Sequence, residues 1–96
     1  MNITKTVNGS EATLALEGWL DTQASPELHA ALEDLGDDVS SLIFDLTTLE
    51  YISSSGVREF VSAHKKMNGA FTVKNASAGI MNIFKATGID KKIRFE

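Results

Sequence analysis

The chain contains no cysteine, and this absence excludes disulfide bonds, thiolate catalysis and thiolate metal sites together. Long apolar runs are also missing, since none approaches the roughly 20 residues that a membrane-spanning helix needs. The first residues lack the charged-then-apolar order of a secretory signal. We therefore expect a cytoplasmic protein without a membrane partner.

Basic charge is scarce as well. Nine Lys and Arg residues stand against thirteen Asp and Glu residues, which gives a formal net charge of -4. Proteins that bind nucleic acids usually carry a basic surface, so we expect no direct nucleic-acid partner. A length of 96 residues with 43% hydrophobic and 23% charged residues fits one domain over residues 1–96.

Hydrophobic periodicity, interrupted by glycines, predicts alternating strands and helices. Alternation or short apolar runs predict strands at residues 3–7, 14–18, 42–46, 71–73 and 93–95. Apolar stripes at helical spacing predict helices at residues 25–35, 53–68 and 77–87. The order β-β-α-β-α-β-α-β predicts an α/β fold with a mixed, mostly parallel sheet covered by helices.

Several details of these elements follow from local signals. The unbroken apolar run at residues 42–44 predicts a central strand that is buried on both faces. Ser25 before a proline predicts a helix N-cap, and Gly36 is a candidate for a left-handed C-cap. We expect Ser77 and Gly88 to mark the two ends of the third helix.

The chemistry of the chain is concentrated where the central strand leads into a helix. Ser53, Ser54, Ser55 and Gly56 stand at that start. Ligands and partners tend to meet α/β sheets at the carboxyl ends of their strands. The first N–H groups of a helix have no intrahelical acceptor, and the helix dipole is positive there, so a phosphate would be held. The alternative is that Ser53 is simply an N-cap and its neighbours are incidental.

Two segments carry a family resemblance. Residues 45–57 resemble the signature of STAS domains, especially those of bacterial anti-sigma factor antagonists. In that family a strand ending in Asp-Leu leads to Asp-Ser-Ser-Gly-Leu at the start of a helix. Residues 16–21, Leu-Glu-Gly-Trp-Leu-Asp, are similar to the Gly-x-Leu-Asp element after the family's second strand. The predicted order of elements also agrees with the STAS fold.

The resemblance implies a partner switch and no enzyme activity, cofactor or metal. The unmodified domain would bind an anti-sigma factor that is also a serine kinase of the histidine-kinase-like ATPase type. Phosphorylation would break this complex, and a serine phosphatase would restore it. By position the acceptor is Ser54, with Ser55 beside it and Gly56 allowing close approach. Asp21 would lie near the surface that faces the kinase.

The chain departs from the family pattern at two positions. Ser53 replaces the family's aspartate, which leaves the choice of acceptor among Ser53, Ser54 and Ser55 open. Arg58 stands where the family often has a small residue, four positions after Ser54 and therefore on the same helical side. Our hypothesis is that Arg58 holds phosphorylated Ser54 or contacts the partner. The alternative is an exposed arginine without a defined role.

Other functions fit the residues less well. No Gly-x-Ser-x-Gly elbow supports a hydrolase, and His29 and His64 are interpreted as a solvated and a boundary residue. Asp45 ends a strand as in receiver domains, but the paired acids that would hold Mg²⁺ are missing. The competing function is a STAS binding or scaffold module without a phosphorylation cycle, and a nucleotide-responsive module of this kind is a further alternative. Trp19 is either part of the edge that faces a partner or a lid over the core, and the gain from burying so large a side chain favours the lid.

Overall fold

The computed structural model describes residues 1–96, and its strands and helices follow the predicted order. The strands are β1 (Asn2–Asn8), β2 (Glu11–Leu20), β3 (Ser41–Ile52), β4 (Phe71–Lys74) and β5 (Arg94–Phe95). The helices are α1 (Ser25–Glu33), α2 (Ser54–Lys66) and α3 (Ala78–Thr87), and the short 3-10 helix η1 (Ile89–Lys91) precedes β5. No helix combines the length and the apolar character that crossing a membrane requires.

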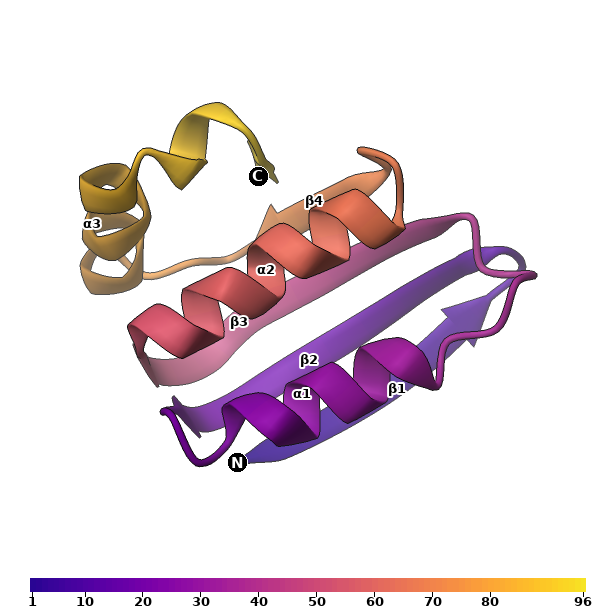
Figure 1. Ribbon diagram of the computed structural model, residues 1–96, viewed down its shortest axis with the longest axis horizontal. Coiled ribbons are helices and arrows are strands. Elements are labelled where there is room, and N and C mark those ends of the chain that lie inside the picture. The colour runs from indigo at the N-terminus through magenta and orange to yellow at the C-terminus, as the bar shows by residue number, and fades with distance from the viewer.

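The strands form one sheet in the order β1-β2-β3-β4-β5, so β3 is central. β1 and β2 are antiparallel, and all later neighbours are parallel. A tight turn at Gly9, where φ is +65°, joins the first two strands, whereas helical connections join the parallel ones. Figure 1 shows α1 and α2 side by side along one face of the sheet. The predicted mixed, mostly parallel α/β fold is confirmed.

The expectation that the central strand is buried on both faces is wrong. Leu42, Phe44 and Leu46 are buried in the core, whereas Ile43 between them is only half-buried. Because α1 and α2 lie on one face of the sheet, the apolar run alternates between a covered and an open face. β3 also continues to Ile52, since two register shifts against β2 keep its carboxyl half paired.

Aromatic side chains join the sheet to the helices. Phe44 of β3 packs edge-to-face against Phe60 of α2 and Phe71 of β4, with ring centroids 4.8 Å apart in both pairs. Phe60 also lies 5.2 Å from the ring of Phe84 in α3. Aromatic pairs of this kind contribute about 0.5–1.5 kcal/mol beyond their burial. These contacts anchor the middle of α2, and the anchored helix presents its N-terminus at the end of β3.

Two of the expected helix ends are confirmed and two are wrong. Ser77 caps α3 through its hydroxyl, and Gly88 ends that helix with a φ of +76°. Ser25 is not an N-cap, because it is the first residue inside α1 and its hydroxyl is bonded elsewhere. Gly36 has no positive φ, because α1 already ends at Glu33.

Candidate functional site

Ser53 joins β3 to α2 and caps the helix. Its backbone N–H donates to the carbonyl of Leu20 at 2.8 Å, which continues the pairing of β2 with β3 by one residue. Its hydroxyl oxygen accepts from the N–H of Gly56 at 3.2 Å, and its carbonyl accepts from Val57 at 2.9 Å. The capping function that the sequence indicated for Ser53 is confirmed.

A chain of serine hydroxyls connects the starts of α1 and α2. The Ser25 hydroxyl donates to the carbonyl oxygen of Asp21 at 2.9 Å, and this bond uses its one proton. The Ser55 hydroxyl, whose oxygen lies 2.9 Å from that of Ser25, must therefore donate to Ser25. The Ser53 hydroxyl, also 2.9 Å from that of Ser55, must in turn donate to Ser55. The bonds run in one direction, from the Gly56 N–H through three hydroxyls to the Asp21 carbonyl. We call this series the hydroxyl chain.

Ser54 differs from the serines on either side of it. Its side chain is exposed, and its hydroxyl forms no hydrogen bond within the protein, whereas the protons of Ser53 and Ser55 are both donated inward. The backbone N–H groups of Ser54 and Ser55 also have no acceptor in the chain. One free hydroxyl thus stands beside two free N–H donors at the positive end of the helix dipole. We call residues 53–55 the serine tip.

Gly56 lies directly below the serine tip and is buried. A Cβ atom at this position would stand 2.8 Å from Cγ of Leu20 and 3.0 Å from Cγ1 of Ile52. Such distances leave no room for a side chain unless the core shifts. Gly56 therefore packs the two segments that carry the family resemblance against each other. The close approach of a partner at Gly56 stays a prediction.

Asp21 orders the turn between β2 and α1. Its Oδ1 accepts from the N–H of Ala24 at 2.8 Å, and its carbonyl accepts from both the N–H and the hydroxyl of Ser25. The residue is half-buried and stands at the end of the hydroxyl chain. These bonds give Asp21 a structural role in the turn. Contact of Asp21 with a kinase stays a prediction.

Arg58 is exposed and takes part in none of the ion pairs of the structure. The first turn of α2 contains no acidic residue that could pair with it. Its guanidinium is therefore available to an added anion on the same side of the helix. By contrast, the next residue, Glu59, accepts from Nδ1 of His29 at 3.0 Å and links α2 to α1.

Trp19 and Tyr51 form an aromatic pair that the sequence interpretation missed. They are register partners on β2 and β3, with ring centroids 5.2 Å apart and an interplanar angle of 34°. Trp19 is 58% exposed and Tyr51 40%, so the interpretation of Trp19 as a lid over the core is wrong. The alternation of β2 could have shown this, because Leu14, Leu16 and Leu20 point inward and position 19 is out of phase with them.

Asp45 ties the middle of β3 to the residue that follows β4. Its Oδ1 accepts from the Thr47 hydroxyl at 2.6 Å, from the Asn75 side-chain amide at 3.0 Å and from the Thr47 N–H at 3.1 Å. These bonds hold the pKa of Asp45 below its ordinary value of 3.8, and the bond from the Thr47 hydroxyl contributes most to this lowering. Asn75 accommodates this contact with a φ of +64°, a conformation that asparagine tolerates.

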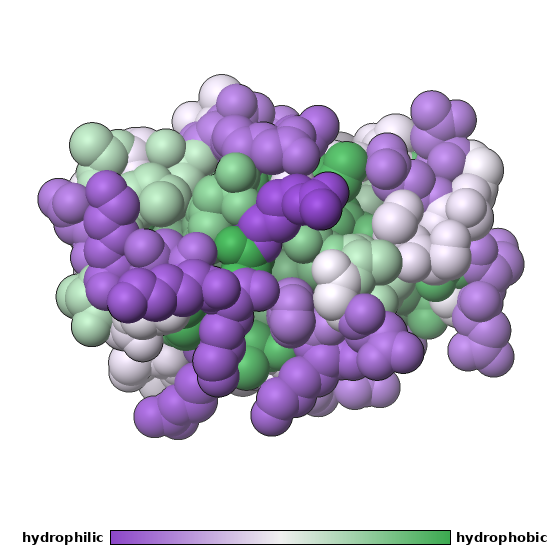
Figure 2. All heavy atoms as spheres, turned by 90° about the horizontal axis from the view of Figure 1, so that it is seen from above, coloured by the Kyte–Doolittle hydropathy of each residue, from purple (hydrophilic) through white to green (hydrophobic).

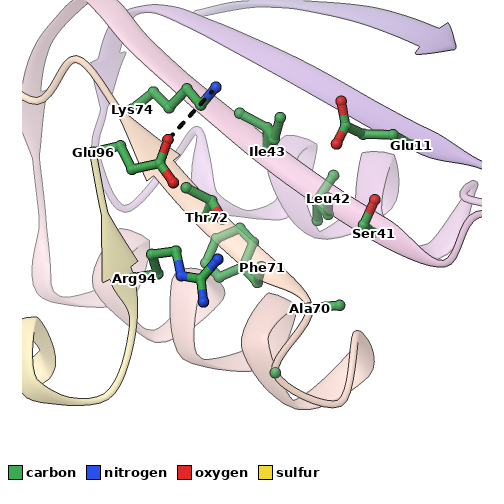
Figure 3. Close-up of a pocket in the computed structure, with 11 residues that line it drawn as sticks. Glu11, Ser41, Leu42, Ile43, Ala70, Phe71, Thr72, Lys74, Arg94 and Glu96 are labelled. Carbon is green, nitrogen blue, oxygen red and sulfur yellow. Dashed lines mark ion pairs between the residues drawn. The ribbon is translucent and has the colours of Figure 1, made fainter.

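A hollow of about 380 Å³ lies at the amino ends of β3 and β4, at the other end of the central strand from the serine tip. Both signs of charge line it, including Arg94 and the ion pair of Lys74 with Glu96 at 3.8 Å (Figure 3). Figure 2 views the molecule from the top of Figure 1, the side on which α3 and the C-terminus lie, and shows hydrophobic atoms bordered by hydrophilic ones. None of the candidate site residues Asp21, Ser53, Ser54, Ser55, Gly56 and Arg58 lines this hollow, so the serine tip remains the candidate site.

Comparison with known proteins identifies one family and one similar protein. A model of the STAS domain family matches residues 2–96. The chain is 25% identical over 92 residues to the anti-sigma-B factor antagonist of Bacillus subtilis (strain 168), an alignment that covers 93% of this chain and 84% of that protein.

Solved structures share the fold. An anti-sigma factor antagonist from Mycobacterium paratuberculosis is 20% identical with a TM-score of 0.88, covering 98% of this chain and 83% of that one. The anti-sigma factor antagonist SpoIIAA of Bacillus, in its unphosphorylated form, is 18% identical with a TM-score of 0.80, covering 99% of this chain and 88% of that one. Its phosphorylated form is 17% identical with a TM-score of 0.68, covering 99% and 91%.

Proposed function

The chain belongs to the STAS domain family, and from this membership we propose that it is an anti-sigma factor antagonist controlled by phosphorylation of Ser54. In its unmodified form it binds an anti-sigma factor that is also a serine kinase of the histidine-kinase-like ATPase type. Phosphorylation of Ser54 by that partner breaks the complex, and a serine phosphatase restores it. The protein itself acts by binding and not by catalysis.

The observation that carries this proposal is the difference between Ser54 and its neighbours. A kinase needs a hydroxyl that it can reach and whose proton is not engaged in the structure of its substrate. Ser54 is exposed and unbonded, whereas the Ser53 and Ser55 hydroxyls belong to the hydroxyl chain. This difference supports Ser54 over Ser53 and Ser55, a choice that the sequence left open. Ser53 accepts from the Gly56 N–H and so caps the helix without the family's aspartate.

The serine tip is suited to carry a phosphoryl group without loss of the fold. The free N–H groups of Ser54 and Ser55 and the helix dipole favour a negative charge at this end of α2. No acidic residue of the first turn would repel it. Arg58, unpaired and one helical turn further on, adds a cation that can bind phosphate through two parallel hydrogen bonds.

The same phosphoryl group would oppose a protein complex. It adds about -1.5 to -2 charges at neutral pH, which must lose water when a partner covers the serine tip. An uncompensated charge in a buried contact costs about 2–5 kcal/mol, and each 1.4 kcal/mol is about tenfold in affinity. A loss of affinity of about thirtyfold to a few thousandfold therefore requires no change of fold.

The proposal is tested with the histidine-kinase-like ATPases of the source organism, each produced and purified singly and titrated against the protein. We expect one of them to bind the wild type, to phosphorylate Ser54 in the presence of ATP, and to bind Ser54→Asp at least about tenfold more weakly. Ser54→Asn is the neutral control at the same position, and Ser62→Asp places the same charge on an exposed position of α2.

The outcomes separate the switch from the passive module. Binding of Ser54→Asp at wild-type affinity, with Ser54 unmodified by mass spectrometry in protein from the host, would leave a STAS binding module without a phosphorylation cycle. Phosphate on Ser53 or Ser55 alone would contradict the choice of acceptor and leave the antagonist function intact. If none of the ATPases binds the wild type, the proposed partner class is wrong.

A further inference from the structure

The exposed pair of Trp19 and Tyr51 is an unusual surface for so small a protein. An aromatic side chain gains much from burial, yet these two pack against each other and remain 58% and 40% exposed. Aromatic residues are also the ones that dominate the free energy of binding at protein interfaces. Both lie on the face of the sheet opposite the buried Leu20 and Ile52, their neighbours in sequence. The pair is therefore positioned for contact with another molecule.

Acidic side chains border the aromatic pair. Glu17 and Glu50 are both exposed, and neither takes part in an ion pair. The Glu17 carboxylate accepts one neutral hydrogen bond, from the Asn2 side-chain amide at 3.0 Å, and keeps its full charge. Glu17 precedes Trp19 by two residues on β2, and Glu50 is the neighbour of Tyr51 at a register shift of β3. The two carboxylates line one shallow hollow, together with residues 47–49. We call these four side chains, Glu17, Trp19, Glu50 and Tyr51, the aromatic patch.

The aromatic patch leads directly into the serine tip. Trp19 and Tyr51 are paired in register, the next pair is Leu20 with Ile52, and the N–H of Ser53 then bonds to the Leu20 carbonyl at 2.8 Å. Only two residues thus separate Tyr51 from Ser54 along the chain. A partner that covers Ser54 would reach the two rings by extending over this end of the sheet onto its open face.

We propose that the aromatic patch is a docking surface for a basic segment of the anti-sigma partner, a lysine or arginine of which lies over the rings. This inference rests on the proposed function and adds to it a contact and a partner chemistry. An aromatic face attracts a cation within about 6 Å of its centre, and arginine also stacks on such a face. The unpaired carboxylates of Glu17 and Glu50 favour the same cation and disfavour an acidic partner.

A second copy of this chain fits the aromatic patch less well. Two copies docked through it would bring four unpaired carboxylates together, and each chain already carries a formal net charge of -4. Like charges placed opposite one another in an interface oppose association. The charge of the patch therefore favours a basic partner over self-association.

The chain contains its own probe, because Trp19 is the single tryptophan and Tyr51 the single tyrosine. We would titrate each purified histidine-kinase-like ATPase of the source organism against the wild type, Trp19→Ala and Tyr51→Ala by calorimetry, and record the fluorescence of Trp19. We expect a blue shift and reduced acrylamide quenching on binding, and an affinity loss of at least tenfold in both variants. Val7→Ala is the matched control, since Val7 is 49% exposed at the far end of β1.

Charge is tested separately with the double variant Glu17→Gln and Glu50→Gln. We expect it to bind several-fold more weakly at low salt and to show a flatter dependence of affinity on salt than the wild type. Wild-type affinity of Trp19→Ala and Tyr51→Ala, with circular dichroism showing both folded, would overturn the docking surface and leave the proposed function standing. A dimer of the pure protein that Trp19→Ala abolishes would instead make the patch a self-contact. If no ATPase binds the wild type, both proposals fail.

Discussion

The hydroxyl chain makes a quantitative prediction about stability. Ser25→Ala removes the bonds of Ser25 to the Asp21 carbonyl and to Ser55, and Ser55→Ala removes the bonds of Ser55 to Ser25 and to Ser53. A net hydrogen bond contributes about 0.5–1.5 kcal/mol, so each variant should lose about 1–3 kcal/mol of unfolding free energy. The bond between Ser25 and Ser55 is lost in both, so the double variant loses three bonds and not four.

The two substitutions should therefore be less than additive, with a coupling of about 0.5–1.5 kcal/mol. Alanine is a better helix former than serine, which reduces each single effect by up to about 0.5 kcal/mol. This contribution is the same in the single and double variants and cancels in the cycle. Urea unfolding of the wild type, the two single variants and the double variant measures the coupling directly.

Ser54 supplies the control for this cycle. Ser54→Ala removes no hydrogen bond, so it should change the unfolding free energy by less than about 0.5 kcal/mol and add to Ser25→Ala without coupling. Additivity of Ser25→Ala and Ser55→Ala within about 0.3 kcal/mol would show that the bond between them contributes nothing. Ser55 would then be no more engaged than Ser54.

Further predictions concern the support of the site. Gly56→Ala should destabilise the protein in urea unfolding, because overpacking against Leu20 and Ile52 costs about 1–3 kcal/mol. This cost exceeds the gain of about 0.5–1 kcal/mol that alanine brings to a helix. Gly79→Ala is the control and should be neutral or stabilising, because a Cβ atom there meets nothing within 4 Å. The lowered pKa of Asp45 contributes stability that is present above its ordinary value of 3.8 and is lost as the pH falls through the lower folded value. Urea midpoints should thus fall more steeply below pH 4 in the wild type than in Asp45→Asn, and equal slopes would exclude this carboxylate as a source of acid sensitivity. Arg58→Ala should leave the unfolding free energy within about 0.5 kcal/mol and speed phosphatase release of phosphate from Ser54, while an unchanged rate would assign Arg58 no part in holding it.

The serine tip depends on both local and long-range contacts. The sequence placed Ser53, Ser54 and Ser55 at a helix start, because capping depends on residues within a few positions of one another. It could not tell which hydroxyl is free. That choice depends on Ser25, which lies 30 residues away from Ser55 and meets it only when α1 packs beside α2.

The element order was determined by the sequence itself, because period-two and helical hydrophobic patterns are local properties that survive any arrangement of the elements. The ends of α3 at Ser77 and Gly88 were also determined by the sequence, because helix capping is a local property as well. Tertiary structure alone decided that one face of β3 stays open and that Trp19 of β2 is paired with Tyr51 of β3. Burial and pairing of this kind depend on what the rest of the chain places opposite a residue, and no window of neighbouring residues contains that information.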